Sequence, residues 1–423
     1  MALTAQQRES ILAKIQSLVA EKYFDPAFDH SAWQAIVTRN RPAIVGASST
    51  ADFEGAIGKM LTELSPKTLG LLSDHTPITP RNAINASFSV QTISSELRWV
   101  FQDVLPGGIA ARAGVRSGDV LLMAAGKPMQ PLTEAASEPA FEMQQTIPLV
   151  VSRGNPASEN QLVLSTSKPK YKDNPYSEPA ALTVGSQAGD TAYLRVSLFP
   201  GKIGIDFANE LDSIFRGRLA TADRLIIDLR GNPGGGIGGL TLMSYLTPHR
   251  IPIGYSKNRK MAQEQKDPSA LPVFDKVPRS KLAIPGLAVK FFGKTSVFLY
   301  TEALGRRSHH GRTAILVNEH TTGAAEMLAQ FAQENRLATI VGAKTPGRLV
   351  SRTASKLGFG YRLIVPVAAY VSAKGTLIEG KGITPNIPVP WSFPDAVAGK
   401  DNQIEAAIQA LASAKANSGP FSG

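Results

Sequence analysis

The feature that most constrains this sequence is a strand–turn–helix signal around residue 320. Ala314–Val317 is a short and almost wholly apolar run, which is typical of a buried strand. From Gly323 onward apolar residues such as Met327 and Phe331 recur at helical spacing, which predicts a helix with one face turned inward. Asn318–Thr322 is therefore a turn whose backbone N–H groups point at whatever lies above the sheet. Acyl-transfer enzymes use such a turn to place a nucleophile beside an oxyanion hole.

A second turn of this kind is rich in glycine. Leu225–Leu229 reads as a buried strand, and the segment Gly231–Gly238 that follows holds five glycines in the pattern Gly-Asn-Pro-Gly-Gly-Gly-Ile-Gly. Glycine lets backbone N–H groups approach a substrate carbonyl closely. A phosphate-binding loop would also carry glycines after a strand, but it would need a Lys-Ser/Thr pair that is absent here. A dinucleotide site is disfavoured because no suitably placed acidic residue follows.

The region from about residue 86 to residue 166 has the pattern of short strands and turns. At its centre, Pro106-Gly-Gly predicts a turn, Ala110–Ala113 a short helix that Gly114 ends, and Gly118-Asp119 a turn into another strand. This pattern resembles PDZ domains of the bacterial, protease-associated kind. The resemblance implies that an extended carboxy-terminal peptide adds a strand to the sheet edge. Ala86–Gln91 is a candidate for that edge, with Phe88 and Val90 as peptide-binding residues; the alternative is an edge covered by a helix.

With the two turns in this order, the chain resembles the tail-specific, or carboxy-terminal processing, peptidases of the S41 serine peptidase family. In that family a nucleophilic serine stands three residues before a helical glutamate, and a lysine follows the serine by 25 residues. Glu326 matches the glutamate, which puts Gly323 at the nucleophile position and Arg348 at the base position. In relatives that use a histidine, Lys67 falls about where that histidine would be.

The resemblance also assigns an oxyanion hole to Gly234 or Gly235 together with Ala324. It implies a multidomain α/β (α+β) fold with an N-terminal helical segment, a PDZ-like β domain and a crotonase-like β/α core. We expect the helical domain at residues 1–80, the PDZ domain at 81–168 and the peptidase core at 169–423. Residues 249–312, which are dense in Lys, Arg and Pro, are expected to form a lid or insertion whose one convincing strand is Ser296–Thr301.

The chemistry at the centre departs from that of the family. Gly323 offers no nucleophile, and the guanidinium of Arg348 stays protonated and cannot act as a base. Thr322 is a displaced candidate nucleophile, although Thr321 and Thr322 are more simply explained as helix caps. His320 is a candidate polar group of the pocket. Arg348 would add a positive charge whose fork suits a carboxylate.

Three functions remain open from the sequence. The first is a peptidase that uses a displaced nucleophile such as Thr322. The second is a pseudopeptidase that binds polypeptide carboxy termini through the PDZ domain and the cleft. The third is a non-peptidase enzyme that uses the oxyanion hole for acyl or enolate chemistry on a carboxylate substrate, a hypothesis that rests on likeness of fold alone.

Composition narrows the partners. The chain has 423 residues and no cysteine. Its formal charge is +11, but Lys and Arg are scattered and no nucleic-acid-binding motif occurs in the sequence. We therefore expect a polypeptide or small carboxylate partner and no nucleic acid. Two adjacent histidines, His309 and His310, lack a third ligand, so neither a metal nor another cofactor is expected. No apolar run reaches the ~20 residues of a membrane span. The N-terminus lacks a signal-peptide core, which predicts the cytoplasm, or the periplasm if a signal was removed; an oligomer is left open.

Overall fold

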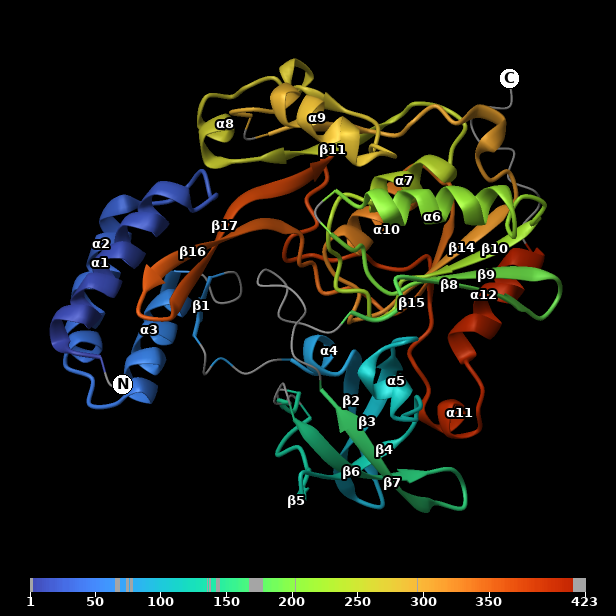
Figure 1. The fold of residues 1–423 in the computed structure, drawn as a ribbon, viewed down its shortest axis with the longest axis horizontal. Helices are drawn as coiled ribbons and strands as arrows, with labels where there is room; N and C mark the ends of the chain where they lie inside the picture. Colours follow the sequence, from blue (N-terminus) through green and yellow to red (C-terminus); the bar gives the residue numbers. More distant parts are fainter. Residues whose placement is uncertain are drawn as a thin grey trace.

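The computed structural model describes residues 3–64, 69–73, 76, 79–134, 136, 138–141, 145–166, 178–201, 203–294 and 296–413. Lys67, the candidate for the histidine position, lies outside these residues. The described part of the chain forms three six-stranded sheets, each with helices packed against it (Figure 1).

Three helices open the chain. The Thr4 hydroxyl accepts from the backbone N–H of Gln7, and the Gln7 side chain accepts from the N–H of Thr4, so a capping box begins the first helix. The second helix lies within residues 1–80, which were expected to be helical; it contains Pro42, and Asp29 caps its first turn. The helices are α1 (Ala5–Lys22), α2 (His30–Val45) and α3 (Thr50–Leu64).

These helices pack against strands from the far end of the sequence. Their buried side chains form one hydrophobic cluster with Tyr361, Leu363 and Val365 of β17 (Tyr361–Ser372), and Phe53 meets Tyr361 edge to face at 5.5 Å. The same sheet has the order β1-β17-β11-β13-β12, in which β1 is Gly70–Leu72, and β16 (Val350–Gly358) pairs with β17. Helices and hairpin lie side by side in Figure 1.

The segment expected to be a lid or insertion contributes to that sheet. It supplies three strands, of which β11 pairs with β17, so it holds more regular structure than the single strand that the sequence predicted. Its helix α9 lies at the outer surface of the molecule in Figure 1. The elements named here are β11 (Pro252–Lys257), α8 (Arg259–Gln263), β12 (Val273–Phe274), α9 (Ile284–Lys290) and β13 (Phe298–Tyr300).

A separate sheet forms the PDZ domain. Its strand order is β2-β3-β4-β6-β7, all antiparallel, with a short helix α5 (Ile109–Arg112) that ends at Gly114. The predicted turns and short helix are confirmed. The strands are β2 (Ala86–Ile93), β3 (Glu96–Val104), β4 (Val120–Ala124), β6 (Thr146–Arg153) and β7 (Ser158–Ser165).

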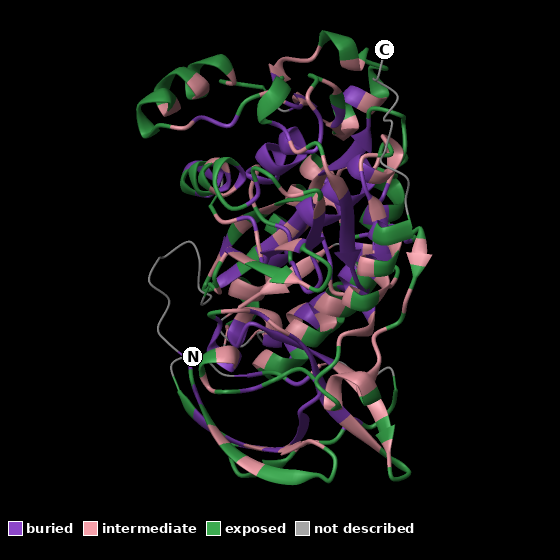
Figure 2. Ribbon diagram, turned by 90° about the vertical axis from the view of Figure 1, so that its right-hand side faces the viewer, coloured by how far each residue is buried: buried purple, intermediate pink, exposed green. Residues whose placement is uncertain are grey.

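The third sheet carries the site. It is parallel except for its edge strand β8, and it is covered on both faces, which is why its central strands are mostly apolar. Purple central strands in Figure 2 mark this burial. In order across the sheet the strands are β18 (Ile387–Pro388), β15 (Thr339–Gly342), β14 (Arg312–Val317), β10 (Arg224–Asp228), β9 (Thr191–Val196) and β8 (Leu182–Gln187).

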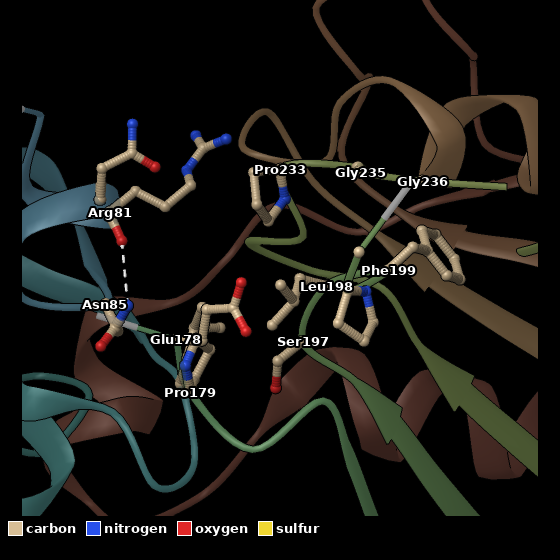
Figure 3. Close-up of a pocket in the computed structure, with 15 residues that line it drawn as sticks. Arg81, Asn85, Glu178, Pro179, Ser197, Leu198, Phe199, Pro233, Gly235 and Gly236 are labelled. Carbon is tan, nitrogen blue, oxygen red and sulfur yellow. Dashed lines mark hydrogen bonds between the residues drawn. The ribbon is translucent and has the colours of Figure 1, made fainter. Parts of the chain in front are cut away.

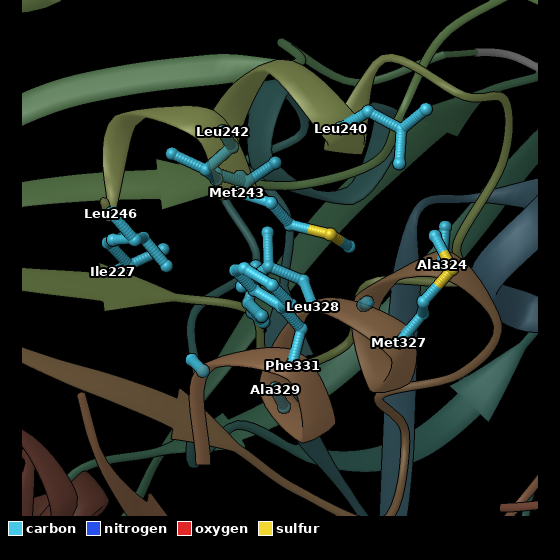
Figure 4. Close-up of a cluster of buried hydrophobic side chains, with 14 of the residues drawn as sticks. Ile227, Leu240, Leu242, Met243, Leu246, Ala324, Met327, Leu328, Ala329 and Phe331 are labelled. Carbon is cyan, nitrogen blue, oxygen red and sulfur yellow. The ribbon is translucent and has the colours of Figure 1, made fainter. Parts of the chain in front are cut away.

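Different helices cover the two faces of this sheet. On one face, α7 (Gly239–Tyr245) and α10 (Ala324–Glu334) pack together through side chains such as Met243 and Phe331 (Figure 4), joined by α6 (Ile205–Arg216). On the other face lies α12 (Asn402–Ser413). Both candidate turns follow strands of this sheet and lead toward helices of the first face, which places them at one edge.

Candidate active site

The turn between β14 and α10 is tied to the glycine-rich turn. Asn318 accepts from the N–H of Gly231 through its side-chain oxygen at 3.0 Å, and its own N–H donates to the hydroxyl of Thr321 at 3.0 Å. The Thr321 hydroxyl in turn donates to the carbonyl of Leu229 at 2.9 Å. Because Asn318 and Thr321 are both buried, these bonds fix the two turns against each other.

Gly323 begins α10 in a conformation that few other residues adopt. Its φ is 64° and its ψ is −127°, and its N–H donates to the carboxylate of Glu326 at 3.1 Å. A Cβ at this position would lie 3.4 Å from both the Cα of Gly234 and the carbonyl oxygen of Pro233, which is ordinary van der Waals contact. The position therefore has room for a small side chain, although its backbone is strained for one.

The side chain of Glu326 joins the nucleophile position to the base position. Its carboxylate is fully buried and also accepts from the Thr345 hydroxyl at 2.5 Å and from the N–H groups of Gly347 and Arg348 at 2.7 and 2.8 Å. One carboxylate thus holds both Gly323 and the segment that carries Arg348. Each of its oxygens accepts two hydrogen bonds.

Arg348 is held only by its backbone. Its residue is exposed, and among the described residues no carboxylate lies within ion-pair distance of its guanidinium. The next residue, Leu349, donates its N–H to Glu379 at 2.7 Å, and burial raises the pKa of that carboxyl group despite this bond. The arginine fork is therefore available to a ligand.

Gly234 and Gly235 differ in what their amides do. The N–H of Gly234 donates to the Asn232 side chain at 2.7 Å, so it is not available to a substrate. Phe199 bonds to the groups on either side of Gly235, donating to Gly234 O and accepting from Gly236 N, so the N–H of Gly235 points the other way. Within the described part of the chain, the N–H of Gly235 and the N–H of Ala324 have no acceptor.

Close packing explains why glycine occupies these positions. A Cβ on Gly235 would lie 2.1 Å from the carbonyl oxygen of Phe199, and one on Gly234 would lie 2.9 Å from the N of Ala324 and from the O of Thr322. Both glycines also have positive φ. The glycine turn and the start of α10 therefore touch directly.

A cavity of about 410 Å³ opens beside this contact (Figure 3). One wall is the glycine turn and Phe199, and the other comes from α4 (Pro80–Ala83), the short helix that leads into the PDZ domain. The polar side chains that line it are Arg81, Asn82, Asn85, Glu178 and Ser197.

Arg81 is a residue of this site that sequence reasoning missed. Its side chain extends toward Pro233 in Figure 3, and one terminal nitrogen donates to the hydroxyl of Thr322 at 3.5 Å. Burial lowers the pKa of Arg81, and the charge of Arg348 lowers it further, against the opposing charges of Glu138 and Asp103. No sequence motif marks Arg81, because it lies 241 residues from the threonine it contacts.

Thr322 and Thr321 do not cap the helix, so that prediction is wrong. Gly323 is the N-cap, and Glu326 bonds back to it. Thr321 stabilises the turn, as described above, while Thr322 donates its N–H to Asn232 O at 2.8 Å and has Arg81 beside its hydroxyl. Among the described residues no basic group that could take a proton contacts the Thr322 hydroxyl.

His320 faces the PDZ domain instead of the cavity. Its Nδ1 lies 2.8 Å from the carboxylate of Asp103 and 2.9 Å from the hydroxyl of Ser87. Because both partners meet the same ring nitrogen, this is not the geometry of a serine–histidine–aspartate triad, in which serine and aspartate meet opposite nitrogens. Burial disfavours the charged imidazole, but the hydrogen bond and charge of Asp103 outweigh it and raise the pKa of His320.

Further contacts strengthen this junction between the PDZ domain and the turn. The Asn318 side chain donates to both oxygens of Asp103 at 2.9 and 3.0 Å, and Gln102 donates to Glu319 at 2.7 Å. Strand β3 is thereby bonded to the turn that precedes Gly323. We call the set Ser87, Asp103, Asn318 and His320 the junction cluster.

The predicted peptide-binding strand β2 is the edge strand of the PDZ sheet. The Phe88 side chain, however, is buried in the PDZ core against Phe101, so it is not available to a bound peptide. That N–H donates to Glu138 at 2.8 Å. Val90 is half-buried.

The predicted residues thus divide into groups. Gly323, Ala324 and Thr322 lie together against the glycine turn, and Glu326 ties Arg348 to them. His320 lies at the PDZ junction. In the described part of the chain no group of three or more His, Asp or Glu residues is arranged to hold a metal ion, and no helix is both long and apolar enough to cross a bilayer.

Two family models match the chain. Residues 190–389 match peptidase family S41, and residues 100–138 match a PDZ domain. The chain is 24% identical over 407 residues to a carboxyl-terminal-processing protease of Picosynechococcus sp., covering 92% of this chain and 85% of that protein. It is 24% identical over 424 residues to a protein of the same name from Synechocystis sp., covering 97% and 88%.

Solved structures are similar to the fold over nearly its whole length. The photosystem II D1 C-terminal processing protease has a TM-score of 0.54 at 17% identity, with 90% of this chain and 93% of that chain covered. An S41 protease structure from Bacteroides fragilis has a TM-score of 0.58 at 13% identity, with 94% and 97% covered. These likenesses concern the arrangement of the helical segment, the PDZ domain and the core.

Proposed function

The chain belongs to peptidase family S41, and we propose that it binds polypeptide carboxy termini in the cleft beside Gly323 without serine–lysine hydrolysis. The observation that carries this proposal is the state of the two catalytic positions. Gly323 has no hydroxyl, and Arg348 presents a permanent cation where the reaction needs a neutral amine. The glycine turn and the start of α10 are nevertheless arranged as a binding surface.

A displaced nucleophile fits the site less well. Thr322 is the nearest hydroxyl, yet its partner is the guanidinium of Arg81, which cannot accept a proton. The His320 ring is engaged by Asp103 and Ser87 at the PDZ junction. A hydroxyl that lacks a general base is a weak nucleophile.

Binding of polypeptide is supported from two sides. The relatives named above are carboxyl-terminal-processing proteases, and the PDZ sheet offers the edge strand β2 beside the cleft. The N–H groups of Gly235 and Ala324, which have no acceptor among the described residues, could donate hydrogen bonds to a peptide carbonyl oxygen. An oxygen bound there would be held by hydrogen bonds without a covalent bond to the protein.

A second candidate is favoured by those same amides. Two N–H groups without protein acceptors, near the cation of Arg348, could stabilise an enolate of a small carboxylate substrate. This alternative predicts turnover of a small acid that is lost in Arg348→Ala and kept in Thr322→Val. Binding without turnover of any such acid would exclude it.

The experiment compares the protein with a variant in which both catalytic positions carry the family's residues. The wild type and Gly323→Ser/Arg348→Lys are incubated with a serine-directed phosphonate and with a pool of peptides, and cleavage is followed by mass spectrometry. We expect no labelling and no cleavage by the wild type, and labelling of the serine in the double variant. Gly323→Ser alone is the matched control, and its labelling should be slower because Arg348 is no base.

The wild type decides the proposal. Peptide cleavage by the wild type that is abolished in Thr322→Val would overturn it in favour of a displaced nucleophile. Absence of peptide binding to the wild type would overturn it as well.

A further inference from the structure

The cavity at the glycine turn is lined by a cation without a counter-ion. Arg81 is half-buried, and among the described residues its buried Nε has no hydrogen-bond partner and no carboxylate lies within ion-pair distance of its guanidinium. Within the same residues, the terminal nitrogens make one hydrogen bond, the long one to the neutral hydroxyl of Thr322. Burial of an arginine nitrogen in this state is costly unless an anion reaches it.

The nearby carboxylates are already engaged. The charges of Glu138 and Asp103 act on Arg81, but both carboxylates have other partners. Glu138 accepts a hydrogen bond from the N–H of Phe88, and Asp103 is bonded to the other members of the junction cluster. In Figure 3 the carboxylate of Glu178 lies below the guanidinium, toward Leu198 and Ser197. An incoming anion would therefore meet Arg81 at the end of the cavity next to Thr322.

Other positive groups converge on that end. The backbone N–H groups of Arg348 and Gly323 donate to the same oxygen of Glu326, which places the backbone of Arg348 beside the start of α10, and the charge of Arg348 lowers the pKa of Arg81. The N–H groups of Gly235 and Ala324 add partial positive charge, and α10 directs its N-terminus there. A carboxylate fits between such groups because an arginine fork can bind both of its oxygens.

We propose that Arg81, with Arg348, forms a carboxylate subsite that receives the free α-carboxylate of a polypeptide chain at the glycine turn. This deepens the proposed function, on which it rests: the cleft holds a chain end, where an enzyme of this family would hold an internal peptide bond. The α-carboxylate of a chain end would place a negatively charged oxygen against the N–H groups of Gly235 and Ala324 without any chemical step. The subsite lies in the cleft and is distinct from the β2 edge of the PDZ domain.

The test separates an α-carboxylate from other sources of negative charge. Three pools of N-acetylated tripeptides with randomised side chains are used: one with free carboxylate ends, one with carboxamide ends, and one with carboxamide ends and an internal aspartate in every member. Affinity is measured by isothermal titration calorimetry, and cleavage is followed by mass spectrometry on the same samples. We expect the free-acid pool to bind at least about tenfold more tightly than either amide pool.

Arg81→Gln tests the residue itself. It should remove the preference for the free acid, while Arg81→Lys should restore part of it, because lysine keeps the charge but loses the fork. The matched control is Arg218→Gln, which removes an exposed arginine that lines none of the cavity and should keep the preference. The thermal unfolding midpoint of each variant is compared with that of the wild type to check that the variant is folded.

The outcomes are distinguishable. Equal binding of the acid and amide pools to the wild type would overturn the subsite and leave the proposed function standing, and this comparison does not depend on any variant folding. Tight binding of the internal-aspartate pool would assign the subsite to an acidic side chain and overturn the chain-end proposal. Cleavage of the pools with the acid preference retained would overturn the proposed function and support the subsite.

Discussion

Glu326 is the residue on which the geometry of the site depends most, although it lies beneath the surface that a ligand would meet. Its carboxylate accepts four hydrogen bonds, two of them from the backbones of Gly323 and Arg348. Glu326→Gln replaces an acceptor oxygen with an NH₂ group that faces donors. We expect the free energy of unfolding to fall by about 2–4 kcal/mol, because donors are left unsatisfied in a buried place. Urea unfolding measures it.

A matched substitution isolates that effect. Glu210→Gln changes an exposed glutamate on α6 and should alter the free energy of unfolding by less than about 0.5 kcal/mol. If Glu326→Gln were as mild as Glu210→Gln, Glu326 would not be the anchor of the two catalytic positions.

The sequence alone indicated which residues stand at the start of α10, but not which side chains from distant parts of the chain lie around them. Gly323 and Glu326 lie in one strand–turn–helix unit, where neighbours in sequence stay neighbours in space, whereas Arg348 was assigned from the 25-residue spacing of the family that the chain resembles. Arg81 was missed, since its position in the cavity depends on how α4 lies against the core. The helix caps were misassigned because a threonine hydroxyl can satisfy a turn or a neighbouring strand as readily as a helix N–H.

Among the elements, strand β3 and the turn before α10 are joined by a bond that responds to pH. The pKa of His320 is raised in the folded protein, with Asp103 as the favourable partner, Glu319 adding to it, and burial and Arg81 opposing it. A raised folded pKa contributes stability that is complete below the usual pKa of histidine and is lost as pH rises through the folded value. The junction should therefore weaken on the alkaline side of neutrality.

We expect the free energy of unfolding of the wild type to fall by roughly 1 kcal/mol between about pH 7 and pH 9, because a charge-assisted hydrogen bond contributes about 1 kcal/mol. The free energy of unfolding of His320→Asn should fall by less, because this variant lacks the titrating group. Urea unfolding at both pH values measures the difference. Burial lowers the pKa of His309 to about 4, so His309 is neutral across this window and does not interfere. His310→Asn, an exposed control, should behave as the wild type. An identical loss in His320→Asn would contradict the role given to the junction cluster.

Elements with strong periodicity were predicted well, and those set by pairing across the chain were not. The PDZ turns and the two core strands follow from local glycine and apolar patterns. Helix α2 lies within the stretch that was expected to be helical, but its bounds were not predicted, and it contains Pro42 near its end. Strand β12 in the insertion is only two residues long and exists through its pairing with β13, which no local pattern signals.

For the whole molecule, the helical segment and the C-terminal hairpin form one hydrophobic core. Residues of α1, α2 and α3 share a cluster with Leu357 of β16 and Tyr361 of β17. The two parts are more than 290 residues apart in sequence, and one cannot keep its apolar face from water without the other. Unfolding of the helices and of the hairpin should be one event.

The three tryptophans allow this to be measured. Trp33 lies buried in α2, Trp99 lies in the PDZ strand β3, and Trp391 lies next to the core. Variants that retain a single tryptophan, with phenylalanine at the other two positions, report each part separately by fluorescence during urea unfolding. We expect the Trp33 and Trp391 midpoints to coincide. A clearly lower midpoint for Trp33 would show that the helices melt independently.

The backbone at Gly323 has a consequence for any side chain introduced there. An added Cβ would lie 3.4 Å from its nearest neighbours, so a serine would meet no severe clash, but the φ of 64° is strained for residues other than glycine. A hydroxyl introduced beside the glycine turn would therefore carry a conformational cost that the hydrogen bond from this backbone to Glu326 would have to offset.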